Sequence, residues 1–164
     1  AGVEMALWDV IGKAANRPVH QLMGGACRAE VDYFAFPQGD TADELAKNAR
    51  TAVEAGYSVV YMKVGRGERQ DLENVAAVRA AIGDRKLRLD ANEAWDVHTA
   101  ITMINRLARF EPEFIEQPTP ALSLAALRQV KDAVHVPIAA DQSVYTLNDV
   151  YEVCRQGAAD LIVL

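Results

Sequence analysis

The stretch Lys86-Leu-Arg-Leu-Asp-Ala-Asn92 decides how the rest of this 164-residue chain is interpreted. Its apolar residues Leu87 and Leu89 alternate with polar residues, which is the period-two pattern of a short β-strand. The strand therefore ends with Asp90 and Asn92 on one face, at the point where strand becomes loop. A reactive side chain at the end of an apolar strand is the feature that organises the chain.

Three other short apolar segments end in the same way. Residues 59–63 end at Lys63, residues 113–116 at Glu116, and residues 137–141 at Asp141, and each end lies 25 to 27 residues after the previous one. A repeat of this length accommodates a strand, a helix and the return to a parallel strand. Four consecutive strands are thus predicted to end in Lys, Asp, Glu and Asp.

The remaining sequence predicts the class of fold. Helical periodicity marks residues 3–15, 41–55, 71–82, 96–110, 123–134 and 147–156, and further strands are expected over 31–36 and 160–164. Alternating strands and helices indicate a parallel α/β sheet with right-handed crossovers. A doubly wound open sheet is the alternative, but its ligand groups gather at one switch point. Reactive residues on successive strands favour a partial TIM-type (β/α) barrel, with roughly the first six of its strands.

Composition excludes several classes of protein. The chain is 51% hydrophobic and 24% charged, which is typical of a globular protein. A net charge of −6 without a basic stripe argues against nucleic acid as a partner. No apolar run approaches the ~20 residues that span a membrane, and no signal peptide is visible. Two cysteines are too few for a disulfide framework, so we expect a cytoplasmic location.

Three carboxylates converging from adjacent strands repel one another. Each pair at ~4 Å costs about 4 kcal/mol at an effective dielectric constant of ~20. A divalent cation relieves this cost, and ligands that are all oxygen favour Mg²⁺ first and Mn²⁺ second. The simpler interpretation is that Asp90, Glu116 and Asp141 are separate helix caps or surface ion pairs. Three carboxylates in register favour the metal site.

Lys63 ends the strand before the one that carries Asp90, and its side chain is predicted to point into the same open end of the barrel. Beside a bound cation and partly buried, a lysine has a lowered pKa and becomes a usable base. A metal ion with a lysine suits removal of the proton α to a carboxylate, since the ion stabilises the developing enolate. Tyr61 shares the face of Lys63, and Asn92 and Gln117 are candidates to contact substrate or to support the ligands.

Six motifs, in this order, cover essentially the whole chain and resemble those of the enolase superfamily. They are Trp8-Asp9 through Gly12-Lys13, Leu22-Met-Gly-Gly25, Tyr61-Met-Lys-Val-Gly65, Asp90-Ala-Asn92, Phe114-Ile-Glu-Gln-Pro118 and Ala140-Asp-Gln-Ser143. Within the superfamily the chain is most similar to the mandelate racemase/muconate lactonizing enzyme family. The resemblance implies that Asp90, Glu116 and Asp141 are three Mg²⁺ ligands and that Lys63 is the second lysine of a Lys-x-Lys base motif.

The resemblance also implies a domain organisation. Residues 1–27 correspond to the C-terminal end of an α+β capping domain, including its last helix, and residues 28–164 to an incomplete β/α-barrel domain. The family's second acid/base is expected beyond Leu164, so we expect the isolated 164-residue chain to lack turnover. A homo-oligomer is expected.

Two positions depart from the family pattern. Tyr61 stands where the motif has its first lysine, and Asp141-Gln142-Ser143 replaces the usual Asp-Glu-Ser. Both changes alter the charge around a substrate carboxylate, and Gln142 joins the residues that contact substrate or support the ligands. The identity of the substrate and the subclass of reaction are therefore left open by the sequence.

The residues and the resemblance together predict Mg²⁺-assisted abstraction of the α-proton of a small-molecule carboxylate, in a racemase, epimerase or cycloisomerase. An acid-sugar dehydratase is the nearest alternative, because the same enolate can expel a β-hydroxyl group. An alternative from another class of enzymes is an aldolase-like barrel, in which Lys63 would form a Schiff base with a carbonyl substrate. Outside enzymes, the chain is an inactive partial barrel.

Overall fold

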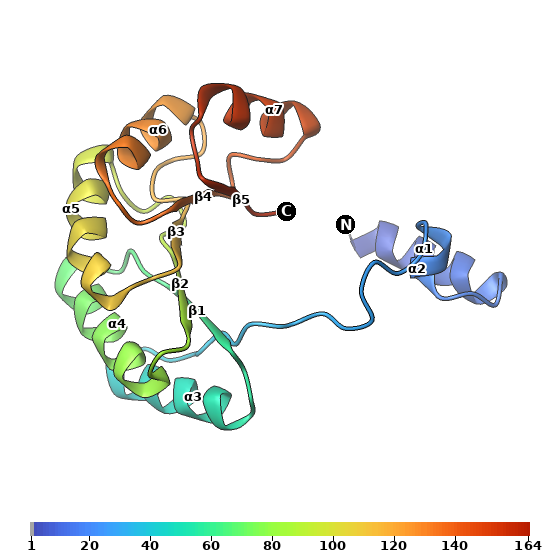
Figure 1. Ribbon diagram of the computed structural model, residues 1–164, viewed down its shortest axis with the longest axis horizontal. Coiled ribbons are helices and arrows are strands. Elements are labelled where there is room, and N and C mark those ends of the chain that lie inside the picture. The colour runs from blue at the N-terminus through green and yellow to red at the C-terminus, as the bar shows by residue number, and fades with distance from the viewer. Residues whose placement is uncertain (1) are drawn as a thin grey trace. The chain divides into compact units, whose positions relative to one another are not determined.

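The computed structural model describes residues 2–164 of the chain. These residues form two compact units, which divide between Asp32 and Tyr33 (Figure 1). The first unit is small and the second contains every strand. Within residues 2–164, no helix combines the length and the apolar character needed to cross a membrane.

The first unit consists of helix α1 (Gly2–Ala14) and the short helix α2 (Val19–Leu22). The end of α1 packs closely on the turn that follows it, because a side chain at Gly12 would meet the carbonyl oxygen of Arg17 at 2.8 Å. Much of the apolar surface of α1 is exposed, at Val3, Met5, Leu7, Val10 and Ile11. Helical periodicity predicted this helix almost to the residue.

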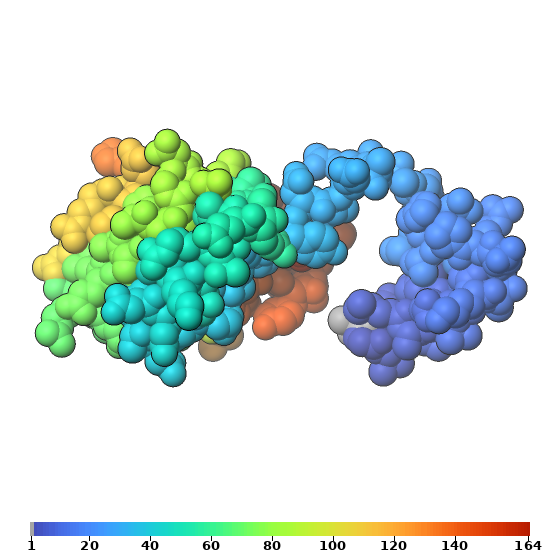
Figure 2. All heavy atoms as spheres, turned by 90° about the horizontal axis from the view of Figure 1, so that it is seen from below, coloured from blue at the N-terminus to red at the C-terminus, as the bar shows by residue number. Residues whose placement is uncertain are grey.

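The second unit alternates helices and strands. In chain order its elements are α3 (Ala42–Glu54), β1 (Val59–Lys63), α4 (Glu68–Ile82), β2 (Lys86–Asp90), α5 (Val97–Leu107), the 3₁₀-helix η1 (Ala108–Phe110), β3 (Phe114–Glu116), α6 (Leu124–Ala133), β4 (Ile138–Ala140), α7 (Leu147–Gln156) and β5 (Leu161–Ile162). All strand pairs are parallel, in the order β1-β2-β3-β4-β5. Figure 1 shows helices α3 to α7 along the outer side of a curved sheet, and α3 and α4 lie side by side (Figure 2).

This winding distinguishes the two folds that the sequence allowed. A doubly wound sheet reverses its strand order at a switch point and carries helices on both faces. Here the strand order follows the chain and the helices cover one face, as in a β/α-barrel. The predicted partial barrel is confirmed.

The prediction of a strand over residues 31–36 is wrong in extent. Within the described residues the sheet has five strands, and this segment contributes a single bridge between Ala35 and Val60. Ala35 donates to the carbonyl of Val59 at 2.9 Å and accepts from the amide of Tyr61 at 2.9 Å. A strand needs a continuing ladder of such bonds, and the segment contacts the edge of β1 at this one residue.

Side-chain alternation gives the sheet two different faces. Residues such as Met62, Leu87, Leu89 and Ile115 are fully buried against the helices and form the main core. Tyr61, Phe114 and Ala139 form a separate buried cluster on the inner face. Because side chains two residues apart share a face, Lys63, Asp90 and Glu116 also point to the inner face. The fold therefore separates an apolar core from a polar surface on opposite sides of the same strands.

Capping side chains set where the helices begin. Thr41 and Glu44 form a reciprocal capping box at α3, and Asp96 accepts from the amide of Thr99 at α5. Helix α4 begins at Glu68, three residues earlier than predicted. The side chain of Asp71 turns back instead and accepts from amides of the preceding loop, so it does not start the helix.

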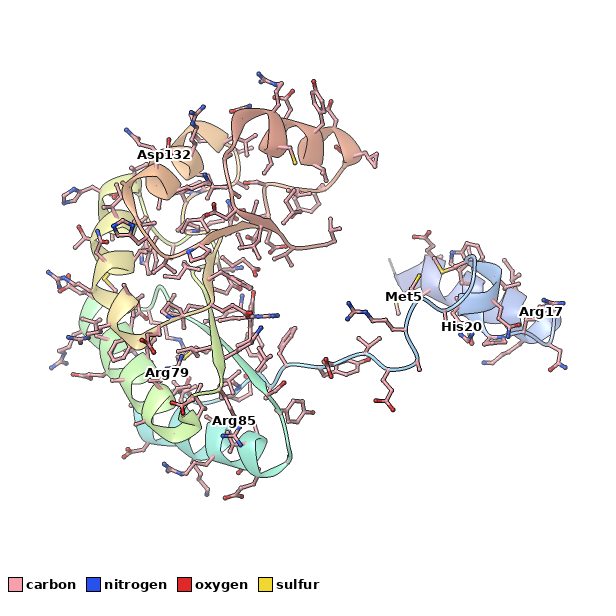
Figure 3. The ribbon with its side chains drawn as sticks, viewed as in Figure 1. Met5, Arg17, His20, Arg79, Arg85 and Asp132 are labelled. Carbon is pink, nitrogen blue, oxygen red and sulfur yellow. The ribbon has the colours of Figure 1, made fainter. Side chains whose placement is uncertain are left out.

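Arg79 joins the end of α4 to the segment that precedes β3 (Figure 3). Its guanidinium donates to the carbonyls of Phe110 at 2.8 Å, Gly83 at 2.8 Å, Arg85 at 2.7 Å and Glu111 at 3.1 Å. Carbonyls at a helix end lack partners within the helix. One arginine therefore supplies donors to three carbonyls at the ends of α4 and η1 and to the carbonyl of Arg85 before β2.

Candidate functional site

Strand register brings the predicted site residues to one edge of the sheet. Lys63 lies opposite Asp90, and Asp90 lies opposite Glu116. Glu116 pairs with Ala139, so Asp141 follows two residues later, directly after β4. The carboxyl ends of parallel strands meet at the same edge. The four side chains predicted from strand ends therefore lie at adjacent positions there.

Asp90 is almost completely buried and both of its oxygens are engaged. Oδ2 accepts from Nζ of Lys63 at 2.9 Å, while Oδ1 accepts from the backbone amide of Asn92 at 2.7 Å. The side chain of Lys63 is 47% exposed, so the lysine can reach a molecule in the mouth of the sheet. Asn92 adopts a φ of 48°, a conformation that asparagine tolerates, and the residue is exposed. It contacts Asp90 through its backbone.

Glu116 is 3% exposed and accepts a hydrogen bond from the hydroxyl of Tyr61. Burial raises the pKa of Glu116 to about 7; the Tyr61 hydrogen bond lowers it, and the charges of Asp90 and Asp141 raise it further. Burial, followed by the bond to Glu116, raises the pKa of Tyr61 well above its ordinary value. The phenol therefore stays protonated and donates a hydrogen bond to Glu116. The centre of the site holds an excess of negative charge.

Gln117 follows Glu116 and is completely buried. Its Oε1 accepts from the amides of Asp141 at 3.0 Å and Ser143 at 3.1 Å. Its Nε2 donates to the carbonyl of Thr119 and to Oγ of Ser143, both at 2.9 Å. Three of these bonds connect the end of β3 to the loop after β4, and the bond to Thr119 stays within the loop after β3. Gln117 thus fixes the backbone of Asp141 through the hydrogen bond from the Asp141 amide.

Gln142, the residue that departs from the usual Asp-Glu-Ser, lies in the same loop. Its Oε1 is buried and has no hydrogen-bond partner among residues 2–164. The neighbouring Ser143 donates through Oγ to the carbonyl of Ala121 at 3.2 Å, which fixes the loop next to it. The hydrogen bonds of Ser143 thus fix the loop that contains Gln142.

The donor set fits a hard divalent cation in chemical type. Asp90, Glu116 and Asp141 offer oxygen only and lie at neighbouring strand ends; burial is the main cause that raises the pKa of Glu116, and the charges of Asp90 and Asp141, which a cation would offset, raise it further. Among residues 2–164, no three His, Cys, Asp or Glu side chains are gathered closely enough to hold a metal ion as they stand.

Two features near the site escaped the sequence analysis. Asp71 is 1% exposed and accepts from the amides of Gly65 at 2.9 Å and Arg66 at 3.1 Å, so it fixes the loop that follows Lys63. A signal was present, because Asp71 shares one face of α4 with the buried residues Val75, Val78 and Ile82. A carboxylate on the apolar face of a helix needs partners.

The second missed feature is aromatic. Phe34 and Phe36 lie against Tyr61, with ring centroids 4.9 and 5.3 Å from its ring. No periodicity of the sequence indicates this contact, because the residues lie on segments separated by α3.

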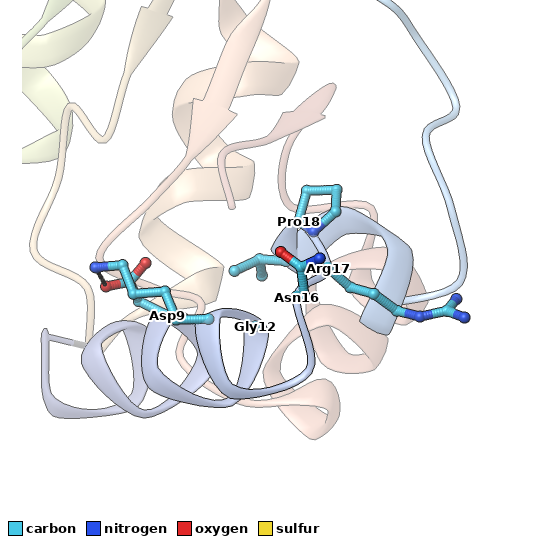
Figure 4. Close-up of a pocket in the computed structure, with 7 residues that line it drawn as sticks. Asp9, Gly12, Asn16, Arg17 and Pro18 are labelled. Atoms are coloured by element: carbon cyan, nitrogen blue, oxygen red, sulfur yellow. Dashed lines mark hydrogen bonds and ion pairs between the residues drawn. The ribbon is translucent and has the colours of Figure 1, made fainter.

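One of two cavities described here lies next to the candidate site. A cavity of about 220 Å³ lies beside Lys63; its lining includes Phe36, Gly39 and Arg66. Another, of about 310 Å³, belongs to the first unit (Figure 4); it is lined by Asp9, Gly12, Lys13, Asn16, Arg17, Pro18 and Val19. The second cavity contains none of the predicted site residues.

Comparisons with known proteins identify the family. The profile described as "Enolase C-terminal domain-like" matches residues 44–164, and the profile of the mandelate racemase/muconate lactonizing enzyme N-terminal domain matches residues 1–24. The chain belongs to the mandelate racemase/muconate lactonizing enzyme family of the enolase superfamily.

Individual relatives include isomerases. The chain is 34% identical to the hydrophobic dipeptide epimerase of Enterococcus faecalis, over 99% of this chain and 46% of the relative. It is 37% identical to muconate cycloisomerase 1 of Rhodococcus opacus, over 100% of this chain and 45% of the relative. The dipeptide epimerase of E. faecalis in complex with Mg and the dipeptide L-Leu-L-Tyr superposes with a TM-score of 0.84 at 35% identity, covering 94% of this chain and 44% of that one. The chain thus spans about half the length of these relatives.

Proposed function

We propose that this protein removes the α-proton of a small carboxylate substrate with the assistance of Mg²⁺, as a racemase, epimerase or cycloisomerase. The observation that carries the proposal is the register of Lys63, Asp90 and Glu116 on three neighbouring strands, followed directly by Asp141. This register places the amine of Lys63 beside Asp90 and brings Glu116 and Asp141 to the same edge of the sheet. Family membership and the isomerase relatives support the same class of reaction.

Asp90, Glu116 and Asp141 would hold Mg²⁺, with Mn²⁺ as a substitute. Bound Mg²⁺ supplies the positive charge that stabilises the enolate formed when the proton leaves. Asp90 and Glu116 are buried, so their carboxylates are shielded from competing water. Gln117 fixes the backbone of Asp141 through its amide oxygen. These residues therefore create the electrostatic setting and take no proton from the substrate.

Lys63 is the base. Its amine accepts the α-proton, the C–H bond breaks, and the electron pair remains on the substrate as the enolate. Lys63 suits this role because its side chain is 47% exposed at the edge where the carboxylates lie, and binding of Mg²⁺ by Asp90 would release its amine from the ion pair. Return of a proton to the opposite face of the carbon inverts the centre, whereas in a cycloisomerase the enolate's electron pair breaks the β-carbon–oxygen bond of a lactone and opens the ring, or the reverse of this step forms the enolate. Asn92 is exposed at the same edge and Gln142 lies in the loop after β4, so both are placed to contact substrate.

The test separates metal binding from proton transfer. Calorimetric titration with MgCl₂ should show that Asp90→Asn, Glu116→Gln and Asp141→Asn each weaken binding at least tenfold. Lys63→Ala should bind Mg²⁺ at least as tightly as the wild type, because it frees Asp90 from a competing cation. Wild-type affinity in all three carboxylate variants would refute the assignment of the ligands.

In the full-length protein, proton transfer is followed by NMR as incorporation of deuterium at the α-carbon of L-Leu-L-Tyr and of mandelate in D₂O. Lys63→Ala should abolish exchange. Lys86→Ala is the matched control, because Lys86 also pairs with a carboxylate, Glu113 at 2.6 Å, at the other end of β2. Exchange at the wild-type rate in Lys63→Ala would remove Lys63 from the reaction. Release of a 2-keto acid from an acid sugar would indicate the dehydratase instead, and trapping of Lys63 by borohydride with a carbonyl substrate would indicate an aldolase-like Schiff base.

The assembly and location of the protein remain predictions. We expect a homo-oligomer, which sedimentation of the purified protein would test. The low cysteine content continues to favour the cytoplasm.

A further inference from the structure

We infer that Tyr61 is a positioning residue, which orients the carboxylate of Glu116 for metal binding and does not bind the substrate. This inference rests on the proposed function and extends it to the position at which the chain departs from the Lys-x-Lys motif. Tyr61 lies on β1 and Glu116 on β3, and the phenol hydroxyl crosses the inner face of β2 to donate to Glu116.

Three aromatic rings fix the phenol in this direction. Phe34 and Phe36 lie against its ring at 4.9 and 5.3 Å, and Phe114 meets it edge-on at 6.4 Å. Tyr61 is 8% exposed as a result. Aromatic pairs at these separations and tilts are attractive. The ring is therefore held on three sides, and its hydroxyl is directed at a buried carboxylate.

The hydrogen bond occupies one oxygen of Glu116 and leaves the other available. The glutamate side chain has three rotatable bonds, and ordering them on binding has an entropic cost. Tyr61 provides this order before any ligand arrives. Its position also differs from that of Lys63, which is 47% exposed and faces the mouth of the site. Tyr61 is thus placed to act on Glu116, whereas Lys63 is placed to act on a bound molecule.

Loss of the hydroxyl has two opposed effects on metal binding. A donor withdraws electron density from the carboxylate, so its removal would strengthen the bond of that oxygen to a cation. Its removal also frees the carboxylate to rotate, which weakens binding. Changes in residues that orient metal ligands typically weaken binding by 10- to 100-fold, so the loss of orientation dominates. We expect about a tenfold loss for Tyr61→Phe.

Tyr61→Phe deletes the hydroxyl and keeps the ring among its neighbours. The half-exposed Tyr57 supplies the matched control, Tyr57→Phe. Titration of the protein with MgCl₂ should give a tenfold weaker affinity in Tyr61→Phe and the wild-type affinity in Tyr57→Phe. In the full-length protein, turnover of Tyr61→Phe should return to near the wild-type kcat at saturating Mg²⁺, with an unchanged KM for substrate. A residue that binds substrate would instead raise that KM or lower kcat at saturating Mg²⁺.

A crystal structure of metal-free Tyr61→Phe gives a second readout that does not depend on activity. The inference predicts that the Glu116 carboxylate leaves its wild-type position or occupies several. An unchanged Glu116 with an unchanged Mg²⁺ affinity would overturn it. If wild-type protein bound no Mg²⁺, the proposed function would fail, and the position of Glu116 in the variant would still decide whether Tyr61 orients it.

Discussion

Gln117 offers a quantitative test of how the loop after β4 is held. Gln117→Leu retains a side chain of similar size and removes both ends of the amide. Four groups then lose their partner: the amides of Asp141 and Ser143, the carbonyl of Thr119 and the hydroxyl of Ser143. Each such bond contributes about 0.5–1.5 kcal/mol to stability, and a buried group left without a partner costs more.

These terms give a loss of about 3 kcal/mol in the free energy of unfolding. Four bonds at ~1 kcal/mol set the scale, and water at the partly exposed Asp141 and Ser143 recovers part of it. Urea denaturation followed by the fluorescence of the buried Trp95 measures the change. Gln129→Leu, at an exposed position on α6, is the matched control and should change stability by less than ~0.5 kcal/mol.

The result that would refute this reasoning is equal stability of the two variants at unchanged m-value. Gln117 would then be replaceable by any apolar side chain that fills the space. A second consequence separates support of the loop from simple packing. Because Gln117 holds the amide of Asp141 at 3.0 Å, Gln117→Leu should also weaken Mg²⁺ binding, and Gln129→Leu should not.

Two further predictions concern the sheet and its loops. Burial opposes ionisation of Glu113, but hydrogen bonds from Lys86 and Arg88 lower its pKa below 4.5; its contribution to stability is therefore present above about pH 4.5 and is lost as the pH falls below it. Glu113→Gln should flatten that part of the stability–pH curve measured in urea, and an unchanged curve would contradict the assignment. Gly65→Ala should lower Tm and soluble yield, because φ is 96° there and the new methyl would lie 2.5 Å from Cβ of Ala94; a Tm equal to the wild type would show that the loop shifts freely.

The fold and the strand ends could be predicted because their signals are local. A period of two, a helical period and a repeat of 25 to 27 residues are all present within short windows of sequence. They placed Lys63, Asp90, Glu116 and Asp141 at the ends of successive segments, and the structure brings them to one edge of the sheet. Their chemical roles remain predictions, since those depend on a ligand.

The weakest strand was predicted from the same local signal. Residues 31–36 are rich in the apolar and aromatic residues typical of strands, yet only Ala35 pairs, with Val60. Strand formation depends on a neighbour along the whole length, and composition alone does not report whether that neighbour is present. The start of α4 failed for a related reason, because Asp71 resembles a helix cap in sequence and bonds to the preceding loop in space.

Residues that support the site could be identified but not assigned a partner. Gln117 and Tyr61 were candidates by proximity to Glu116 and Lys63 in the chain. Their partners lie far along it: Tyr61 bonds to Glu116 across 55 residues, and Gln117 to Asp141 across 24. Such contacts are fixed by the register of strands and the path of loops, which no short window of sequence contains.

The register itself explains why the chemistry of this edge is shared by several side chains. In a parallel ladder each residue faces a fixed partner, so Lys63, Asp90 and Glu116 cannot be separated without breaking the sheet. The same strands bury Met62 and Leu89 completely on their other face, and a shift of one residue would exchange the two faces. Packing of the apolar face therefore fixes the position of the charged one. The hydrophobic core behind the strands therefore keeps Asp90 and Glu116 at neighbouring positions in spite of their like charge.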